Sequence, residues 1–241
     1  MSEPLFLVDA LPDGDTVRLD GPEGHHAADV QRLRVGKRLL LGDGRGGVAV
    51  CEVLTAVRGA LDLVVRERRA EPLPRPRVTV VQAIPKGDRG ELAVQVMTEV
   101  GVDVIVPWAA ARSVVRWKAE RGEKALSRWR ATAREAAKQS RRAWFPEVGP
   151  AADLPAVCDR FPGATVLVLH EEATTPLTGV PLPGDGEVIL VVGPEGGVAP
   201  EELDAFVAAG AVPVRLGREV LRTSTAGAAA LATVNTRTAR W

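Results

Sequence analysis

Residues 188–203 have the sequence VILVVGPEGGVAPEEL, from which the fold class of this chain can be predicted. Its first five residues, 188–192, are all apolar, which is typical of a strand buried on both faces of a parallel sheet. A glycine-rich turn follows, and Pro200 then begins a helix whose first turn carries Glu201 and Glu202, which suits the helix dipole. The stretch therefore predicts a strand, a tight turn and a helix, the repeating unit of a parallel α/β sheet.

The same alternation extends to both sides of this stretch. Gly101 is well placed to end one of the helices as its C-cap. We expect strands at 78–83, 102–106, 165–169, 188–192 and 212–216, and helices at 91–100, 119–142, 200–209 and 223–236. The chain from 77 to 241 is therefore predicted to form an α/β domain with a parallel sheet.

Residues 1–70 have a different pattern. Short apolar runs, separated by turns rich in Gly, Asp and Pro, predict a small β-barrel that a helix at about 27–33 interrupts. The segment EPLPRPR, 71–77, has three prolines in alternation, which favour an extended backbone. We therefore predict two domains, 1–70 and 77–241, joined by a proline-rich linker at 71–76.

The amino-acid composition indicates a folded globular protein and argues against several other classes of protein. Of the 241 residues, 46% are hydrophobic and 26% are charged, as expected for a folded globular chain. No apolar run is long enough for a membrane helix and the acidic N-terminus does not resemble a signal peptide, so we expect a cytoplasmic protein without membrane contact. Cys51, Cys158 and three histidines are too few for a disulfide framework or a zinc centre, so we expect no metal.

The net charge is zero, but the charges are unevenly placed. Between Arg112 and Arg142, eight arginines and three lysines accompany three glutamates, which gives a local charge of +8. Arg130, Arg134, Lys138 and Arg142 recur every four residues and would lie on one helical face. Such a stripe suits a polyanion, although charged stripes are often only solvated. Three tryptophans interleave with it, either to pack or to stack on an unpaired base: Trp117, Trp129 and Trp144.

Unusual loops follow three of the expected strands, at 169–172, 193–197 and 216–226. In open parallel sheets, ligands bind beyond the carboxyl ends of the strands. Glycines in the second loop allow close approach of the backbone to a ligand, or serve a tight turn without a ligand. This loop lacks the lysine and the GxGxxG spacing of a phosphate site, and Glu195 adds a negative charge. Because no nucleophile–base arrangement occurs, the pattern favours group transfer from a bound cofactor.

Two motifs, GPEGG at 193–197 and LRT at 221–223, together resemble the SPOUT class of RNA methyltransferases. Over nearly the whole chain, the sequence is similar to one family of that class, the 16S ribosomal RNA uridine-N3 methyltransferases of the RsmE type. Other positions that match the family's pattern are His25, His26, Arg32, Gly36, Asp43, Gly44, Lys86, Thr98, Arg134, Gln139, Arg142 and Pro146.

The resemblance implies a PUA-like RNA-binding barrel, a SPOUT-type parallel sheet with a C-terminal trefoil knot, and a homodimer. It also implies S-adenosylmethionine as cofactor and methylation of N3 of a specific uridine in 16S ribosomal RNA or the small ribosomal subunit. Motif matching gives these cofactor positions: Leu169, His170, Glu171, Val192, Gly193, Glu195, Gly196, Gly197, Leu216, Gly217, Leu221, Arg222, Thr223 and Ala226. The expected RNA-binding positions are Arg32, Lys86, Arg130, Arg134, Lys138, Gln139 and Arg142.

Catalysis would depend on positive charge, because uridine N3 must lose a proton. We expect Arg222 or Arg142 to stabilise the uridinate that forms. The chain departs from the family at Ser224, where Glu is frequent, and at Lys138, which also stands where Glu is usual. Two alternatives stay open: 2′-O-ribose methylation by another kind of SPOUT enzyme, and a non-enzymatic RNA-binding ribosome assembly factor.

Overall fold

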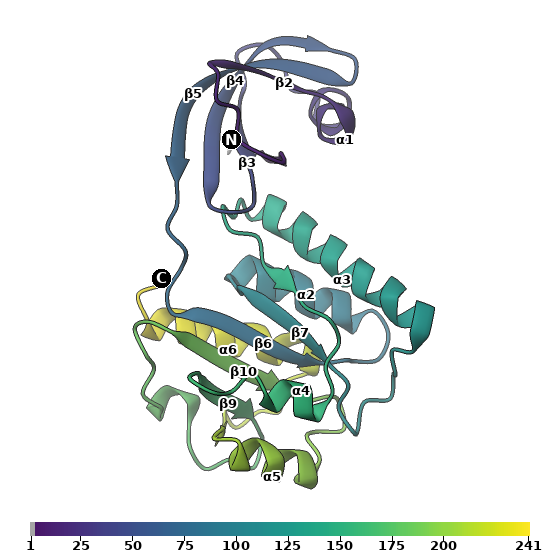
Figure 1. The fold of residues 1–241 in the computed structure, drawn as a ribbon, viewed down its shortest axis with the longest axis vertical. Coiled ribbons are helices and arrows are strands. Elements are labelled where there is room, and N and C mark those ends of the chain that lie inside the picture. Colours follow the sequence, from purple (N-terminus) through teal and green to yellow (C-terminus); the bar gives the residue numbers. More distant parts are fainter. Residues whose placement is uncertain (1–2) are drawn as a thin grey trace. The chain divides into compact units, whose positions relative to one another are not determined.

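The structure, a computed structural model, describes residues 3–241 and shows two structural units (Figure 1). The first unit contains the chain up to Leu73 together with Ala137–Phe145. The second contains Pro74–Ala136 and Pro146–Trp241. Each unit has its own sheet and its own buried core.

The first unit is built on a five-stranded sheet of order β1-β3-β4-β5-β2. Only β1 and β3 pair in parallel; the other pairs are antiparallel. Side chains of Phe6, Leu39, Leu41, Leu61 and Leu63 are fully buried in its core. The strands are β1 (Leu5–Leu7), β2 (Thr16–Leu19), β3 (Arg38–Gly42), β4 (Gly47–Val57) and β5 (Ala60–Ala70).

The helix of the first unit lies earlier than the sequence predicts. Helix α1 (Gly21–His25) has Pro22 in its first turn, where a missing N–H costs nothing, and it continues into a π-helical turn, His26–Val30. Arg32 then takes a left-handed conformation with φ of 53°, which ends the helical path. The prediction of a helix at 27–33 is therefore wrong in its bounds, because a π-turn has no 3.6-residue pattern to recognise.

The segment Ala137–Phe145 returns to the first unit, whereas the sequence assigned it to the second domain. The N–H of Gly46 donates to Ala143 O at 3.0 Å, and the Trp144 indole Nε1 donates to Glu71 O at 2.9 Å. Any side chain at Gly46 would collide with the Trp144 ring, since a Cβ there would lie 2.7 Å from it. Trp144 therefore packs within the first unit, through a contact between distant parts of the chain that no local pattern reveals.

The second unit holds a six-stranded, wholly parallel sheet of order β11-β9-β10-β6-β7-β8, which confirms the predicted α/β class. Its strands are β6 (Arg77–Ala83), β7 (Val104–Trp108), β8 (Glu147–Val148), β9 (Thr165–Leu169), β10 (Glu187–Val192) and β11 (Val212–Val214). Its helices are α2 (Arg89–Val100), α3 (Ala119–Gln139, which ends in the first unit), α4 (Leu154–Cys158), α5 (Pro200–Ala208) and α6 (Thr223–Arg237).

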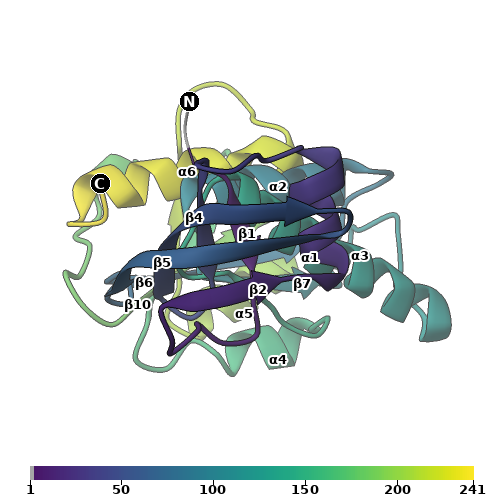
Figure 2. The same cartoon turned by 90° about the horizontal axis from the view of Figure 1, so that it is seen from above.

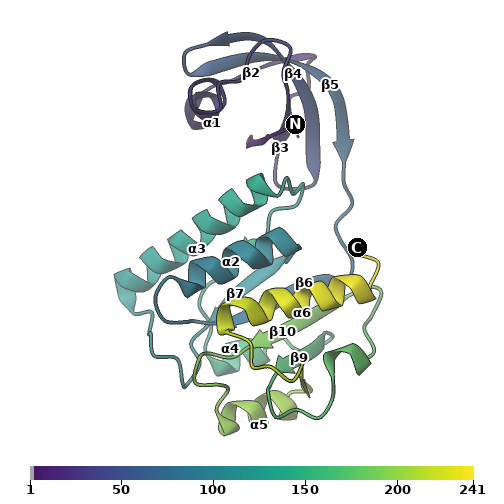
Figure 3. The same cartoon turned by 180° about the vertical axis from the view of Figure 1, so that it is seen from behind.

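Helices cover both faces of this sheet. Helices α2 and α6 contact each other on one face (Figures 2 and 3), where Trp129 of α3 is also buried and packs edge-to-face on Trp117 at 5.0 Å. Phe206 of α5 lies on the other face, beside Trp108 and Phe161. Because helices cover both faces, the strand ends are where we expect a ligand to bind this sheet.

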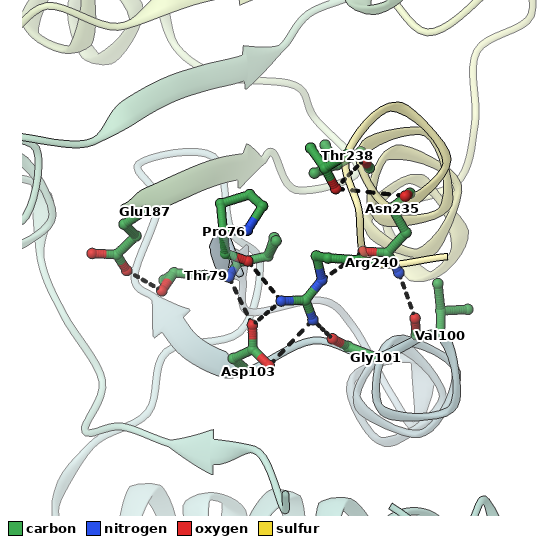
Figure 4. Close-up of polar contacts among 11 residues, drawn as sticks. Pro76, Thr79, Val100, Gly101, Asp103, Glu187, Asn235, Thr238 and Arg240 are labelled. Atoms are coloured by element: carbon green, nitrogen blue, oxygen red, sulfur yellow. Dashed lines mark hydrogen bonds and ion pairs between the residues drawn. The ribbon is translucent and has the colours of Figure 1, made fainter. Parts of the chain in front are cut away.

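The amino ends of the strands are closed by a buried ion pair (Figure 4). Arg240 pairs with Asp103, and their side chains are only 4% and 6% exposed. The guanidinium also donates to the Pro76 and Gly101 carbonyls, each at 2.6 Å, and to Asn235 Oδ1 at 2.9 Å. Asp103 also accepts the Val78 N–H at 2.8 Å. This network ties the end of the chain to the start of two strands.

Candidate active site

A cavity of about 360 Å³ lies at the carboxyl ends of β9, β10 and β11, within the size range of small-molecule sites. Thirteen of the fourteen residues predicted to bind a cofactor line it, all except Gly196. They are Leu169, His170, Glu171, Val192, Gly193, Glu195, Gly197, Leu216, Gly217, Leu221, Arg222, Thr223 and Ala226. Three loops that are separate in the sequence therefore share one cavity.

The buried side chain of Thr223 fixes the inner wall of this cavity. Its hydroxyl donates to Gly193 O at 2.8 Å and accepts from Gln82 Nε2 at 3.0 Å. The start of α6 is thereby tied to the end of β10 and to the end of β6. Gln82 is not among the residues predicted from the sequence, although a lone amide in a largely apolar strand such as β6 can indicate a polar contact.

The glycine-rich turn has two faces. Gly193 packs tightly, because a Cβ there would lie 3.0 Å from the Val198 side chain, and Gly197 takes a φ of +73°. Gly196 instead presents its carbonyl to Arg112, whose Nη1 donates to it at 3.1 Å. A Cβ at Gly196 would meet Arg112 at 3.2 Å, so the structure places this glycine against the loop that follows β7.

Charges of both signs surround the cavity. Its lining includes the arginines Arg89, Arg215, Arg218 and Arg222 and the acids Glu171, Glu195 and Glu219. Glu195 Oε1 accepts the Lys86 backbone N–H at 3.1 Å and is 3.4 Å from Arg89 Nη1. The N-terminus of α6 adds a partial positive charge at Thr223. This mixture suits a ligand that carries both an anionic and a cationic group.

The predicted RNA-binding residues are found in both units. Arg32, Lys86, Arg130, Arg134 and Gln139 are exposed, and Arg142 is half-buried. Arg130 also donates from Nε to Val148 O at 3.1 Å. Of the two predicted catalytic arginines, Arg222 lines the cavity, whereas Arg142 belongs to the first unit.

The prediction that Lys138 belongs to the exposed basic stripe is wrong. Its side chain is 5% exposed and its Nζ is 2.7 Å from Glu23 Oε1. A buried ammonium in an ion pair is not displayed to an external polyanion. We therefore remove Lys138 from the RNA-binding set and assign it to the packing of the first unit.

Several other side chains are excluded from the chemistry. Burial raises the pKa of the Cys51 thiol to about 11 and also raises that of Cys158, so neither is a ready nucleophile. Ser224, at the position where the family frequently has Glu, is buried. Within residues 3–241, no three His, Cys, Asp or Glu side chains gather to hold a metal, and no helix is long and apolar enough to cross a membrane.

Comparison with known proteins defines the family. Residues 71–235 match the RNA methyltransferase domain and residues 19–65 match the RNA methyltransferase PUA domain. The chain therefore belongs to the RNA methyltransferase family, with an N-terminal PUA-like domain.

Relatives that match nearly the whole chain narrow the family to the small-subunit ribosomal RNA methyltransferases of the RsmE type. They confirm the resemblance to this family that the sequence motifs indicated. A Mycobacterium tuberculosis protein named ribosomal RNA small subunit methyltransferase E is 51% identical over 98% of this chain and 93% of its own length. The Bacillus subtilis protein of that name is 29% identical over 95% and 93%. The solved structure of ribosomal RNA small subunit methyltransferase E from Neisseria gonorrhoeae, bound to S-adenosyl methionine, has a TM-score of 0.87, 29% identity and 98% coverage of both chains.

Proposed function

We propose that this chain uses S-adenosylmethionine to methylate N3 of a specific uridine in 16S ribosomal RNA. The observation that carries this proposal is the single cavity that the three strand-end loops build. It rests also on the relatives, which are named small-subunit ribosomal RNA methyltransferases, and on the bound S-adenosyl methionine in the solved structure from Neisseria.

The residues present fit this cofactor. S-adenosylmethionine has a cationic sulfonium, a zwitterionic amino-acid end and an adenine, but no phosphate. The carboxylates of Glu171 and Glu195 suit its cationic groups, and the N-terminus of α6 suits its carboxylate. The apolar side chains of Leu169, Leu216 and Leu221 suit the adenine. When bound, the cofactor supplies an electrophilic methyl group.

The protein then contributes binding, orientation and charge. Holding the acceptor in line with the methyl group would supply much of the rate of such a transfer. Arg222, at the start of α6 and on the cavity wall, stabilises the uridinate as N3 loses its proton. Arg142 is the second candidate for this task.

We propose that RNA is held outside the cavity by basic and amide side chains, all of them exposed except the half-buried Arg142. Their positive charge provides the salt-dependent part of the affinity for phosphate. The proposed residues are Arg32, Lys86, Arg130, Arg134, Gln139 and Arg142.

Finer features of the fold belong to the same proposal: a trefoil knot in the second unit, a cytoplasmic homodimer, and domains at 1–70 and 77–241 with a linker at 71–76. The last helix also contacts an earlier part of this unit. Arg237, in the last turn of α6, donates to Leu177 O at 2.9 Å and to Val180 O at 2.8 Å, so the last helix is tied to the segment between β9 and β10.

The test is methyl transfer from labelled S-adenosylmethionine to 16S ribosomal RNA and to small ribosomal subunits, followed by digestion to nucleosides. The proposal predicts label in 3-methyluridine. Label in a 2′-O-methyl nucleoside would assign a different reaction. No label with either substrate, while the cofactor binds, would leave a non-enzymatic RNA-binding assembly factor.

A further inference from the structure

A second cavity, of about 490 Å³, lies beside the first. It is lined by Lys86, Gly87, Arg89, Val114 and Glu195. Arg89 and Glu195 line both cavities, so these two side chains stand in the wall between them. A group bound in the second cavity therefore borders directly on whatever the first one holds.

The open rim of the second cavity combines cations with an apolar surface. Lys86 is exposed, and Gly87 beside it has a φ of +69° with nothing within 4 Å of where a Cβ would lie. Val114, on the loop after β7, is 73% exposed and gives this rim an apolar side chain. Ammonium and guanidinium groups suit a phosphate, and an apolar surface suits the face of a base.

The dividing wall holds a carboxylate with a defined orientation. Glu195 Oε1 is engaged by the Lys86 N–H and by Arg89 Nη1. Within residues 3–241, no protein group donates to Glu195 Oε2. A carboxylate oxygen is a pure acceptor, so it suits a ligand that presents an N–H.

We propose that the second cavity receives the acceptor nucleotide and that Glu195 accepts the N3 hydrogen of its uracil base. This inference rests on the proposed function and adds the substrate subsite to it. Lys86 and Arg89 face the nucleotide's phosphate, and Val114 lies against the base. Uracil N3 carries a hydrogen, whereas cytosine N3 is an acceptor, so the carboxylate selects uracil and repels cytosine.

The same group completes the proton balance of the transfer. The N3–H bond breaks and the proton moves to the Glu195 carboxylate. The N3 electron pair forms the bond to the methyl carbon. The bond from that carbon to sulfur breaks with its electron pair on sulfur, so the sulfonium becomes the neutral thioether of S-adenosylhomocysteine.

In the experiment, the protein is first saturated with S-adenosylhomocysteine. Uridine 5′-monophosphate or cytidine 5′-monophosphate is then titrated in, and binding is followed by NMR. The wild type should prefer the uridine nucleotide by about tenfold, since the Glu195 carboxylate can accept the N3 hydrogen of uracil but would face another acceptor at N3 of cytosine. E195Q, whose amide can serve either base, should lose the preference and slow single-turnover methylation by ~10²–10⁴-fold. K86A should weaken both nucleotides equally, and R77A, at the far end of β6, should change neither.

Binding of S-adenosylhomocysteine is measured for every variant. If E195Q loses that binding, V114W provides the second test, because it fills only the second cavity and should abolish nucleotide binding with the cofactor product still bound. Equal affinity of the wild type for both nucleotides, or an unchanged preference in E195Q, would overturn the subsite. Failure of the wild type to bind S-adenosylhomocysteine would instead overturn the proposed function itself.

Discussion

The two ends of the parallel sheet in the second unit are built on opposite principles. At the amino ends, Arg240 and Asp103 are buried and satisfy each other and the surrounding backbone (Figure 4). At the carboxyl ends, loops leave a cavity, and the buried Gln82 Oε1 has no hydrogen-bond partner among the described residues. One end is closed by protein groups alone, while the other keeps polar groups and space for a ligand.

In this sheet, the residues that stabilise the fold lie at the amino ends of the strands, and the residues of the candidate site lie at the carboxyl ends. A buried ion pair contributes little net stability when it is complete, but removing one partner leaves an uncompensated charge. A ligand site instead needs polar groups that gain their hydrogen-bond partners only when the ligand binds. Substitutions at the amino ends should therefore change unfolding, and substitutions at the carboxyl ends should change binding.

The largest effect is expected at the amino ends. R240A leaves Asp103 buried without its cation and should lower the free energy of unfolding by ~3–5 kcal/mol, measured by urea denaturation. The matched control is R77A, which removes an exposed arginine 3.6 Å from Glu147 and should change stability by less than ~0.5 kcal/mol. If R240A and R77A lowered the free energy of unfolding by similar amounts, the buried ion pair would matter no more to stability than the exposed one, against this prediction.

A smaller effect is expected on the inner wall of the cavity. T223V removes the hydroxyl that joins Gly193 to Gln82 and should weaken S-adenosylhomocysteine binding by ~10–100-fold, measured by calorimetry. T225V is the control, because that hydroxyl is exposed and donates to Arg222 O, at 3.2 Å, instead of to the wall of the cavity. Equal affinities in the two variants would remove Thr223 from the site.

Helix α3 carries one exposed and one buried basic residue, Arg134 and Lys138, and comparing them tests which basic residues contact RNA. R134A should weaken RNA binding and reduce its salt slope by ~0.7–0.9, with stability almost unchanged. K138A leaves Glu23 without the ammonium now 2.7 Å away and should instead destabilise the first unit by ~2 kcal/mol. RNA titrations at several salt concentrations, together with thermal denaturation, separate the two. A salt-slope change in K138A equal to that in R134A would reinstate Lys138 as a contact.

The smallest effect concerns the thiols. With its pKa raised to about 11, Cys51 is roughly one part in a thousand thiolate at pH 8, so alkylation of the folded chain should be slow and should accelerate as pH rises. Unfolding restores an ordinary pKa and should restore ordinary reactivity. Mass spectrometry after iodoacetamide treatment, with and without urea, measures this; fast labelling of native Cys51 would contradict the raised pKa.

Features with a local signal could be predicted from the sequence. The apolar run of β9 gives its bounds, Thr165–Leu169, without error, and the glycine-rich and LRT loops already name most of the cavity lining. One strand begins later than expected, at Val104, because the Val102 N–H still bonds to Met97 O at the end of α2. That shift follows the C-cap at Gly101.

Features made by long-range contact could not be predicted. Nothing near Lys138 in the sequence indicates that Glu23, 115 positions away, buries it. Gln82 and Arg89 lie on elements whose pattern only predicts a strand and a helix, and their place at the cavities follows from the order of strands in the sheet. Sequence motifs named most residues of the cavity, but packing decides which residues of each motif line it, as Gly196 shows by bonding to Arg112 instead.

The most direct measurement is a calorimetric titration of the wild-type chain and of T223V with S-adenosylhomocysteine. The account predicts saturable binding with one molecule per chain in the wild type and a clearly weaker isotherm in the variant. Absence of binding heat in the wild type, with the cavity still empty in crystals soaked in the same compound, would contradict the claim that these strand ends hold a methyl donor.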